Sequence, residues 1–183
     1  AVVAEERIQD LITLTVDPGV FGGVPLGGAG FGASVNFSAT IDHPSQFDFI
    51  DGGGLDGAFL GFAECDRRGS VNASRFSGRI SGCGGFINIS QNSKKVVFVG
   101  TFTSGGLEAE VGDGRIAIKK EGKFSKFVAE VGQITFSGHR AAEDEQEIYY
   151  VTERCVFKLS PDGLELIEVA PGIDVEKDIL ERM

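Results

Sequence analysis

The chain has 183 residues, of which 42% are hydrophobic and 24% charged, and its formal net charge is −10 at pH 7. This length corresponds to one domain of about 100–200 residues, so we expect a single domain over residues 1–183. The negative charge argues against a protein that binds nucleic acid through a basic surface. No apolar stretch approaches the roughly 20 residues of a membrane-spanning helix. We therefore expect no nucleic-acid and no membrane partner.

Three cysteines without a CxxC spacing indicate neither a disulfide framework nor a structural zinc site. They fit a reducing compartment, and we expect a cytoplasmic protein without a metal. The chain begins at Ala1 and has its single methionine at residue 183. This indicates an internal piece of a longer chain, and removal of an initiator methionine is the alternative.

The front of the chain predicts short elements separated by glycine-rich turns. The first are a helix over residues 2–11, a strand over 11–16 that Asp17-Pro18-Gly19 ends, and a loop over 19–33. A turn over 42–49, leading to Phe47 and Phe49, and a glycine turn over 52–54 follow. The next are a buried strand over 55–63 and an alternating segment over 70–76. A third glycine cluster, 82–85, opens onto residues 86–92. We expect a helix N-terminus there, with Asn88 or Ser90 available for local capping.

From residue 95 the chain predicts mostly β-structure. The expected elements are a central strand over 95–103, a hairpin over 107–122 around Gly112-Asp113-Gly114, strands over 126–138, 147–160 and 163–170, and a closing helix over 174–183 with Asp174 as its N-cap. Ser160-Pro161-Asp162-Gly163 predicts the turn between the last two strands.

Two patterns that could carry chemistry are weak. Gly28, Gly30 and Ala33 match a relaxed dinucleotide-binding fingerprint, but the segment lies too far from its strand and is rich in glycine throughout. His43 before Pro44 is typical of a turn, and His139 of a loop or surface position. Neither histidine is favoured as a catalytic base.

An acid followed by three glycine turns is the more informative pattern. Asp17 ends a predicted strand, where α/β folds place reacting groups. Glycine turns let backbone N–H groups approach a ligand closely, so they can bind an anion without a basic side chain. The equally favoured alternative is that Asp17 only forms a turn before Pro18 and the glycines only make turns.

Long segments, read in order, resemble the second half of a family I coenzyme A transferase of the acetate/3-ketoacid or propionate type. The segments are TVDPGVFGGVPLGGAGFGASVN (15–36), QFDFIDGGGLDGAFLGFAECD (46–66), GSVNASRF (69–76), GCGGFINISQNSKKVVFVGTFTSGG (82–106), ITFSGHRA (134–141) and YVTERCVFKLSPDGLELIEVAPGIDVEKDIL (150–180). The resemblance covers almost the whole chain. It implies an α/β fold with an open mixed sheet, flanking helices and a β-rich second part.

The resemblance implies an enzyme that transfers CoA from an acyl-CoA to a short-chain carboxylate. In this family a glutamate attacks the acyl-CoA, and the reaction passes through an acyl anhydride and an enzyme–CoA thioester. The glutamate position falls on Asp17, whose side chain is one methylene shorter. The shorter reach predicts a weakened or remodelled site, because a misplacement of about 1 Å can cost on the order of 100-fold in rate. Acyl-CoA hydrolysis and a catalytically impaired CoA-binding half are the alternatives.

The resemblance also implies the surroundings of the nucleophile. Gly85 would donate a backbone N–H to the oxyanion, and Gly53, Gly54, Gly61 and Gly84 would line the CoA pocket. Glu64 is an alternative carboxylate, although a structural role at the rim is favoured for it. Coenzyme A is expected as a co-substrate, with no permanently bound cofactor. The remaining partner is the other half of the enzyme, on the same or another chain, in a homo-oligomer.

Overall fold

The structure is a computed structural model that describes residues 3, 6–8, 10–76 and 78–183. It separates the chain into two compact units, Ala1–Gly54 and Leu55–Met183. The sequence predicts one domain over residues 1–183, whereas the contacts gather within each of these two parts. The helix predicted over residues 2–11 falls partly outside the described residues. Among the described residues, no helix is long and apolar enough to cross a membrane.

The first unit is built from very short strands. β1 (Thr15–Val16), β2 (Val20–Phe21) and β5 (Ala39–Thr40) form an antiparallel sheet in the order β1-β2-β5, and β3 (Val24–Pro25) pairs with β4 (Ser34–Val35). The strand predicted over 11–16 is therefore confirmed only at its last two residues. The loop predicted over 19–33 is wrong in part, because β2, β3 and the 3₁₀-helix η1 (Gly28–Gly30) lie within it.

The turn predicted over 42–49 is wrong, because this segment forms the helix α2 (His43–Asp51). Asp42 is its N-cap and accepts a hydrogen bond from the Ser45 amide at 3.1 Å. Pro44 lies in the first turn, where its missing N–H removes no helical hydrogen bond. The proline that suggested a turn thus begins the helix.

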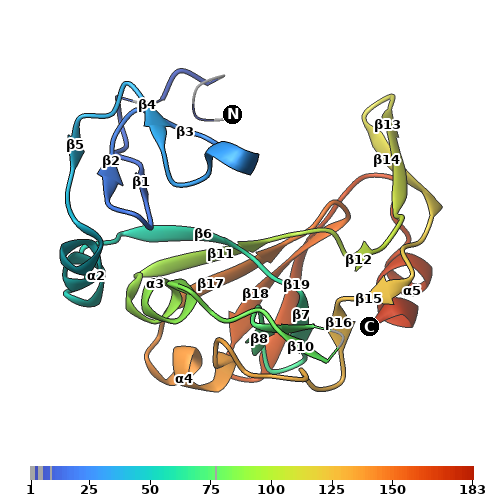
Figure 1. Ribbon diagram of the computed structural model, residues 1–183. Helices are drawn as coiled ribbons and strands as arrows, with labels where there is room; N and C mark the ends of the chain where they lie inside the picture. Colours follow the sequence, from blue (N-terminus) through green and yellow to red (C-terminus); the bar gives the residue numbers. More distant parts are fainter. Residues whose placement is uncertain (1–2, 4–5, 9, 77) are drawn as a thin grey trace. The chain divides into compact units, whose positions relative to one another are not determined.

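A five-stranded mixed sheet organises the second unit (Figure 1). Its order is β19-β18-β17-β11-β6, formed by β6 (Gly57–Gly61), β11 (Lys95–Val99), β17 (Glu147–Val151), β18 (Cys155–Ser160) and β19 (Gly163–Val169). The strands β6, β11 and β17 are parallel, and the last two are antiparallel. The predicted central position of β11 is confirmed. The strand predicted over 55–63 is confirmed as β6, but its predicted burial is wrong, since β6 is an edge strand whose Phe59 is 77% exposed.

One face of this sheet forms the core. Val96, Phe98, Ile148 and Tyr150 alternate with exposed or half-buried neighbours and are fully buried. The helices α3 (Phe86–Asn92) and α4 (Gly138–Glu143) lie on this side of the sheet in Figure 1. The helix predicted over 86–92 is confirmed, but its N-cap is Gly85 and no side chain caps it, so the capping expected from Asn88 or Ser90 is wrong.

Small sheets and one hairpin complete the second unit. They are β7 (Glu64–Asp66) with β8 (Val71–Asn72) and β16 (Phe127–Val128), β9 (Arg75–Phe76) with β10 (Arg79–Ile80), β12 (Thr103–Ser104) with β15 (Phe124–Ser125), and β13 (Glu108–Gly112) with β14 (Arg115–Lys120). The predicted hairpin is confirmed as β13–β14. The closing helix is shorter than predicted, α5 (Val175–Asp178) followed by η2 (Leu180–Arg182), and Asp174 is its N-cap as expected.

Candidate functional site

Asp17 lies in the tight turn that joins β1 to β2. Val16 pairs with Val20 across this turn, and the Gly19 amide donates to the Val16 carbonyl at 2.9 Å. Gly19 has a φ of 105°, and a Cβ there would lie 2.3 Å from the Ile41 carbonyl oxygen. Because only glycine fits this position, the turn is fixed and holds Asp17 at the end of β1.

The Asp17 carboxylate is half-buried and accepts no hydrogen bond from any described residue. Burial raises its pKa above the ordinary value, and the nearby His43 imidazole opposes this shift. A carboxylate with a raised pKa is more basic than a freely solvated one, and its ionised form is therefore a stronger nucleophile. The environment of Asp17 therefore fits attack on an electrophilic carbonyl.

Gln46 fixes the position of β1 through two side-chain hydrogen bonds. This residue of α2 is fully buried, and its Nε2 donates to Thr15 Oγ1 at 3.0 Å and to the Val16 carbonyl at 3.4 Å. Thr15 Oγ1 in turn donates to the Val20 carbonyl at 2.9 Å. Helix α2 and both strands of the turn are thus joined beside Asp17. The sequence analysis missed this contact because it did not predict α2.

The glycines at the end of α2 have a structural role of their own. The amides of Gly53 and Gly54 donate at 2.9 Å to the carbonyls of Ile50 and Phe49, so they cap the helix. Gly53 has a φ of 81°, and a Cβ on Gly54 would lie 2.3 Å from the Phe49 ring. This geometry requires glycine at both positions whether or not a ligand binds nearby.

Gly84 and Gly85 stand at the start of α3 in the second unit. Gly84 has a φ of 51°, and open space surrounds the place where its Cβ would lie. Gly85 is buried, and within the described part of the chain its backbone N–H donates to no acceptor. This N–H is available to an oxyanion. Gly61, the last residue of β6, also faces open space.

Glu64 is held by the protein itself. Its Oε2 accepts hydrogen bonds from Asn72 Nδ2 at 2.8 Å and from the Gly132 amide at 3.0 Å. These bonds join β7 to β8 and to the segment after β16. They fit the structural role that the sequence favoured for this residue.

The candidate residues are distributed over both compact units. Asp17, Gly53 and Gly54 belong to the first unit, and Gly61, Gly84 and Gly85 to the second. The second unit also holds a residue that the sequence analysis missed, Lys126, at the carboxyl ends of the parallel strands. Its only signal in the sequence is a lysine placed just before the apolar pair Phe127–Val128. Among the described residues, no group of three His, Cys, Asp or Glu side chains could hold a metal ion.

Comparison with known proteins gives the class of protein to which this fold corresponds. No protein-family model matches the chain. Over its whole length the chain is 50% identical to the acetate CoA-transferase YdiF of Escherichia coli O157:H7 and to the caffeate CoA-transferase of Acetobacterium woodii. It spans about a third of their length, 34% and 36% respectively.

A solved structure agrees with this result. The crystal structure of the acyl-CoA transferase YdiF from E. coli O157:H7 has a TM-score of 0.93 and 49% identity over 100% of this chain and 34% of that chain. The chain is therefore similar in sequence and in fold to part of a coenzyme A transferase. The resemblance and the fold class predicted from the sequence are confirmed.

Proposed function

We propose that this chain is part of an enzyme that transfers CoA from an acyl-CoA to a short-chain carboxylate. The observation that carries the proposal is the 50% identity to two CoA-transferases along the whole chain. The half-buried carboxylate of Asp17, which accepts no hydrogen bond from the described residues, supports it. The two relatives are named for acetate and caffeate, so the proposal names the class of acid and not one member.

Asp17 is the nucleophile in this proposal. Its carboxylate attacks the acyl-CoA carbonyl, which gives an acyl-aspartyl anhydride and the CoA thiolate. The thiolate attacks the aspartyl carbonyl, forms the enzyme–CoA thioester and releases the donor acid. The acceptor carboxylate then attacks this thioester, which gives a second acyl-aspartyl anhydride and frees the CoA thiolate. The thiolate attacks the acceptor's acyl carbonyl in this anhydride. A new acyl-CoA leaves and the Asp17 carboxylate is restored, so the cycle exchanges one thioester for another without hydrolysis.

Gly85 is the oxyanion donor in this proposal. Each attack places negative charge on a carbonyl oxygen, and a buried N–H without an acceptor stabilises that charge. Gly53, Gly54, Gly61 and Gly84 line the pocket for CoA. The capping bonds of Gly53 and Gly54 mean that their contribution is close backbone approach and not donation of their N–H groups.

The shorter side chain at position 17 supports a second candidate, acyl-CoA hydrolysis. Aspartate leaves room where the family has one more methylene, and a water in that space would attack the acyl intermediate. A catalytically impaired half that still binds CoA is the further alternative. Free CoA released from acyl-CoA without an acceptor acid indicates the hydrolase, and CoA binding without a covalent product indicates the impaired half.

The proposal includes partners and a compartment. The chain spans about a third of its relatives' length. The remaining part of the enzyme, on the same or another chain, therefore completes the site within a homo-oligomer. CoA is a co-substrate and not a resident cofactor. A cytoplasmic location fits the three free cysteines, two of which are buried.

The mass of the complete protein after incubation with acetyl-CoA tests the proposal. Formation of the aspartyl thioester adds one CoA, with the loss of one water, and releases one acetate. We expect this adduct in the wild type, none in Asp17→Ala, and an undiminished adduct in Glu64→Gln as the control for the alternative carboxylate. An adduct that survives in Asp17→Ala would refute the assignment. Adding an acceptor acid then separates transfer from hydrolysis.

A further inference from the structure

Lys126 is a buried lysine at the carboxyl ends of the parallel strands in the five-stranded sheet. It lies between β15 and β16 and is only 7% exposed. Its Nζ lies 4.0 Å from the centre of the Phe62 ring. A Cβ on Gly100 would lie 2.5 Å from the same Nζ. Since Phe62 directly follows β6 and Gly100 directly follows β11, the ammonium lies at the ends of both strands.

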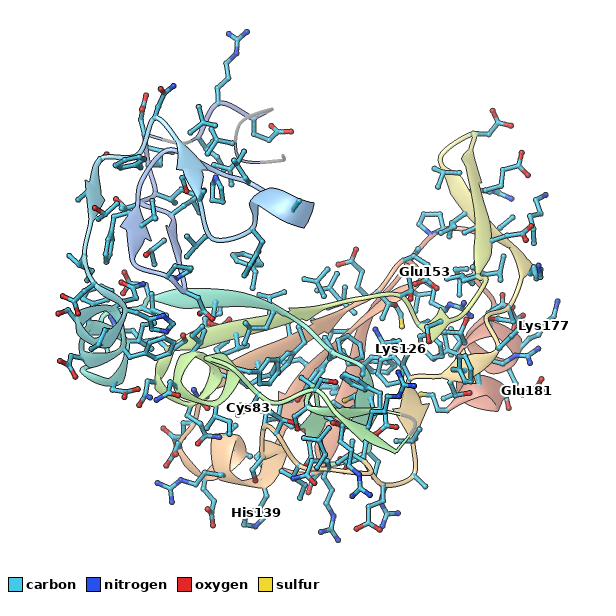
Figure 2. All side chains as sticks on the ribbon, in the orientation of Figure 1. Cys83, Lys126, His139, Glu153, Lys177 and Glu181 are labelled. Carbon is cyan, nitrogen blue, oxygen red and sulfur yellow. The ribbon has the colours of Figure 1, made fainter. Side chains whose placement is uncertain are left out.

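These ends are the carboxyl ends of three parallel strands. Gly61, Val99 and Val151 stand in register across β6, β11 and β17. Open α/β sheets bind their ligands at this edge. Glu153 follows β17 at the same edge, and Figure 2 labels it together with Lys126 beyond the strand ends. The two side chains therefore occupy the position where such folds place binding groups.

No hydrogen bond or ion pair to a described residue engages the Lys126 ammonium. Burial lowers its pKa, and the Glu153 carboxylate opposes this shift. Glu153 is already engaged, because its oxygens accept from Arg154 Nε at 2.7 Å and from the Phe102 amide at 2.8 Å. The side chain is buried along its length, but its ammonium is not among the fully enclosed polar atoms, so its three donors remain available to a ligand. Among the described residues, the ammonium thus contacts an aromatic ring and forms no hydrogen bond or ion pair.

Arg154 shows how this chain treats a buried cation that has a structural role. Its guanidinium is fully buried and bonds to Glu121, Glu153 and the Asp178 carbonyl. Lys126 has the burial without such bonds. The Lys126 ammonium lies beside Gly100, which leaves the space that it needs, and faces the Phe62 ring. Neither residue accepts a hydrogen bond from it.

We propose that Lys126 binds an anionic oxygen of the substrates, either the carboxylate of the acid or a phosphate of CoA. The inference rests on the proposed function for the identity of the substrates. The ammonium is a point charge that accepts either group, and Phe62 and Gly100 position it. Its role is to bind and orient the substrate, since the reaction needs no proton from it.

Steady-state kinetics of the complete enzyme tests this inference. Lys126→Met removes the charge and keeps the length, and Gly100→Ala displaces the ammonium without removing it. We expect both variants to raise the KM of one substrate about tenfold or more, as loss of a charged hydrogen bond predicts. A higher KM for the acid identifies the carboxylate, and a higher KM for acyl-CoA identifies the phosphate. Lys126→Arg should restore part of the effect, and unchanged KM values in Lys126→Met would overturn the inference.

The exposed Lys123, three residues earlier, provides the matched control. Lys123→Met should change neither KM. Thermal unfolding separates binding from a structural role, because the ammonium forms no hydrogen bond or ion pair with a described residue. We expect Lys126→Met to unfold at the same or a higher temperature. A lower unfolding temperature together with a proportionate loss of all activity would mean a structural role and would overturn the inference.

A binding measurement keeps the test independent of the proposed reaction. Calorimetric titrations of the complete protein with acetate and with CoA need no turnover. We expect Lys126→Met to weaken one of these affinities and Lys123→Met to weaken neither. If the wild type does not transfer CoA but Lys126→Met weakens binding, the proposed function fails and the binding site stands. If the wild type transfers CoA but neither affinity nor KM changes, the binding site fails and the function stands.

Discussion

Replacement of Arg154 by methionine should destabilise the protein strongly. Its guanidinium is fully buried, and it bonds to Glu121 at 2.9 and 3.1 Å, to Glu153 at 2.7 Å and to the Asp178 carbonyl at 2.8 Å. Methionine fills a similar space but leaves two carboxylates and a carbonyl without this partner. Breaking a buried ion pair in this way costs about 3–5 kcal/mol.

The structure favours the lower end of this range. The side chains of Glu121 and Glu153 keep 24% and 17% of their surface exposed, so both carboxylates regain part of their hydration. We therefore expect a loss of about 3 kcal/mol in the free energy of unfolding. For a chain of this size the unfolding temperature should fall by roughly 6–12 °C. Urea denaturation at pH 7 gives the first quantity and thermal unfolding the second.

Acid should reduce the difference between variant and wild type. Hydrogen bonds from Arg154 lower the pKa of Glu121 in the folded protein. A lowered folded-state pKa stabilises the protein above the unfolded pKa of about 4.3, and the contribution is lost as the pH falls through the folded pKa. Since Arg154→Met lacks this contribution, its deficit should be smaller near pH 3–4 than at pH 7.

The exposed Arg140 gives the matched control. It pairs with Asp144 at 2.7 Å, but its side chain is 62% exposed. Arg140→Met should cost less than about 0.5 kcal/mol. A loss in Arg154→Met below about 1 kcal/mol, or one equal to that of Arg140→Met, would refute the argument that burial makes the Arg154 bonds important.

Three further predictions concern single residues. Tyr150→Phe should cost about 1–3 kcal/mol in urea denaturation, because it leaves the carbonyl of Gly69, which accepts from the Tyr150 hydroxyl at 2.5 Å, buried without its donor; a neutral variant would contradict this. Asp42→Ala removes the N-cap that binds the Ser45 amide and should cost about 1 kcal/mol, whereas Asp42→Asn should cost far less. The yield of CoA adduct at Asp17 should fall as the pH drops through its raised pKa, because only the ionised carboxylate attacks; an adduct yield that stays constant down to pH 3 would exclude this nucleophile.

Local sequence signals predicted the elements whose partners are close in the chain. The β13–β14 hairpin follows from two alternating segments around a glycine turn, and Asp113 adopts a φ of 51° there. The β18–β19 pair follows likewise from Ser160 to Gly163, which are cross-strand partners. Asp174 caps α5 as predicted, because a cap depends only on the next few residues.

Elements that depend on distant partners were predicted less well. Of residues 11–16, only Thr15–Val16 form a strand, because β2 pairs with those two residues alone. The apolar stretch over 55–63 indicated a buried strand, but strand order places β6 at the edge of the sheet. Periodicity states which residues are apolar and does not state which strand lies next to them.

In the candidate site, too, the sequence predicted some features and missed those that depend on the folded backbone. The resemblance carried by the motifs led to Asp17 and Gly85 as candidate residues. The sequence could not predict that the amides of Gly53 and Gly54 are used by α2, nor that the amide of Gly85 lacks an acceptor among the described residues. Hydrogen bonds of this kind are formed by the folded backbone and leave no pattern in the residue types.

The sequence by itself determined the class of the protein, the approximate positions of most main strands along the chain and the carboxylate at the end of β1. The tertiary structure decided which strand lies at the edge, which buried charge is paired and which is not. Arg154 and Lys126 are both basic residues beside apolar segments, and sequence alone does not separate them. Phe62 and Gly100 follow two strands that are distant from Lys126 in the sequence. They surround its ammonium without a hydrogen bond or ion pair from any described residue, and only the packing of those segments could show it.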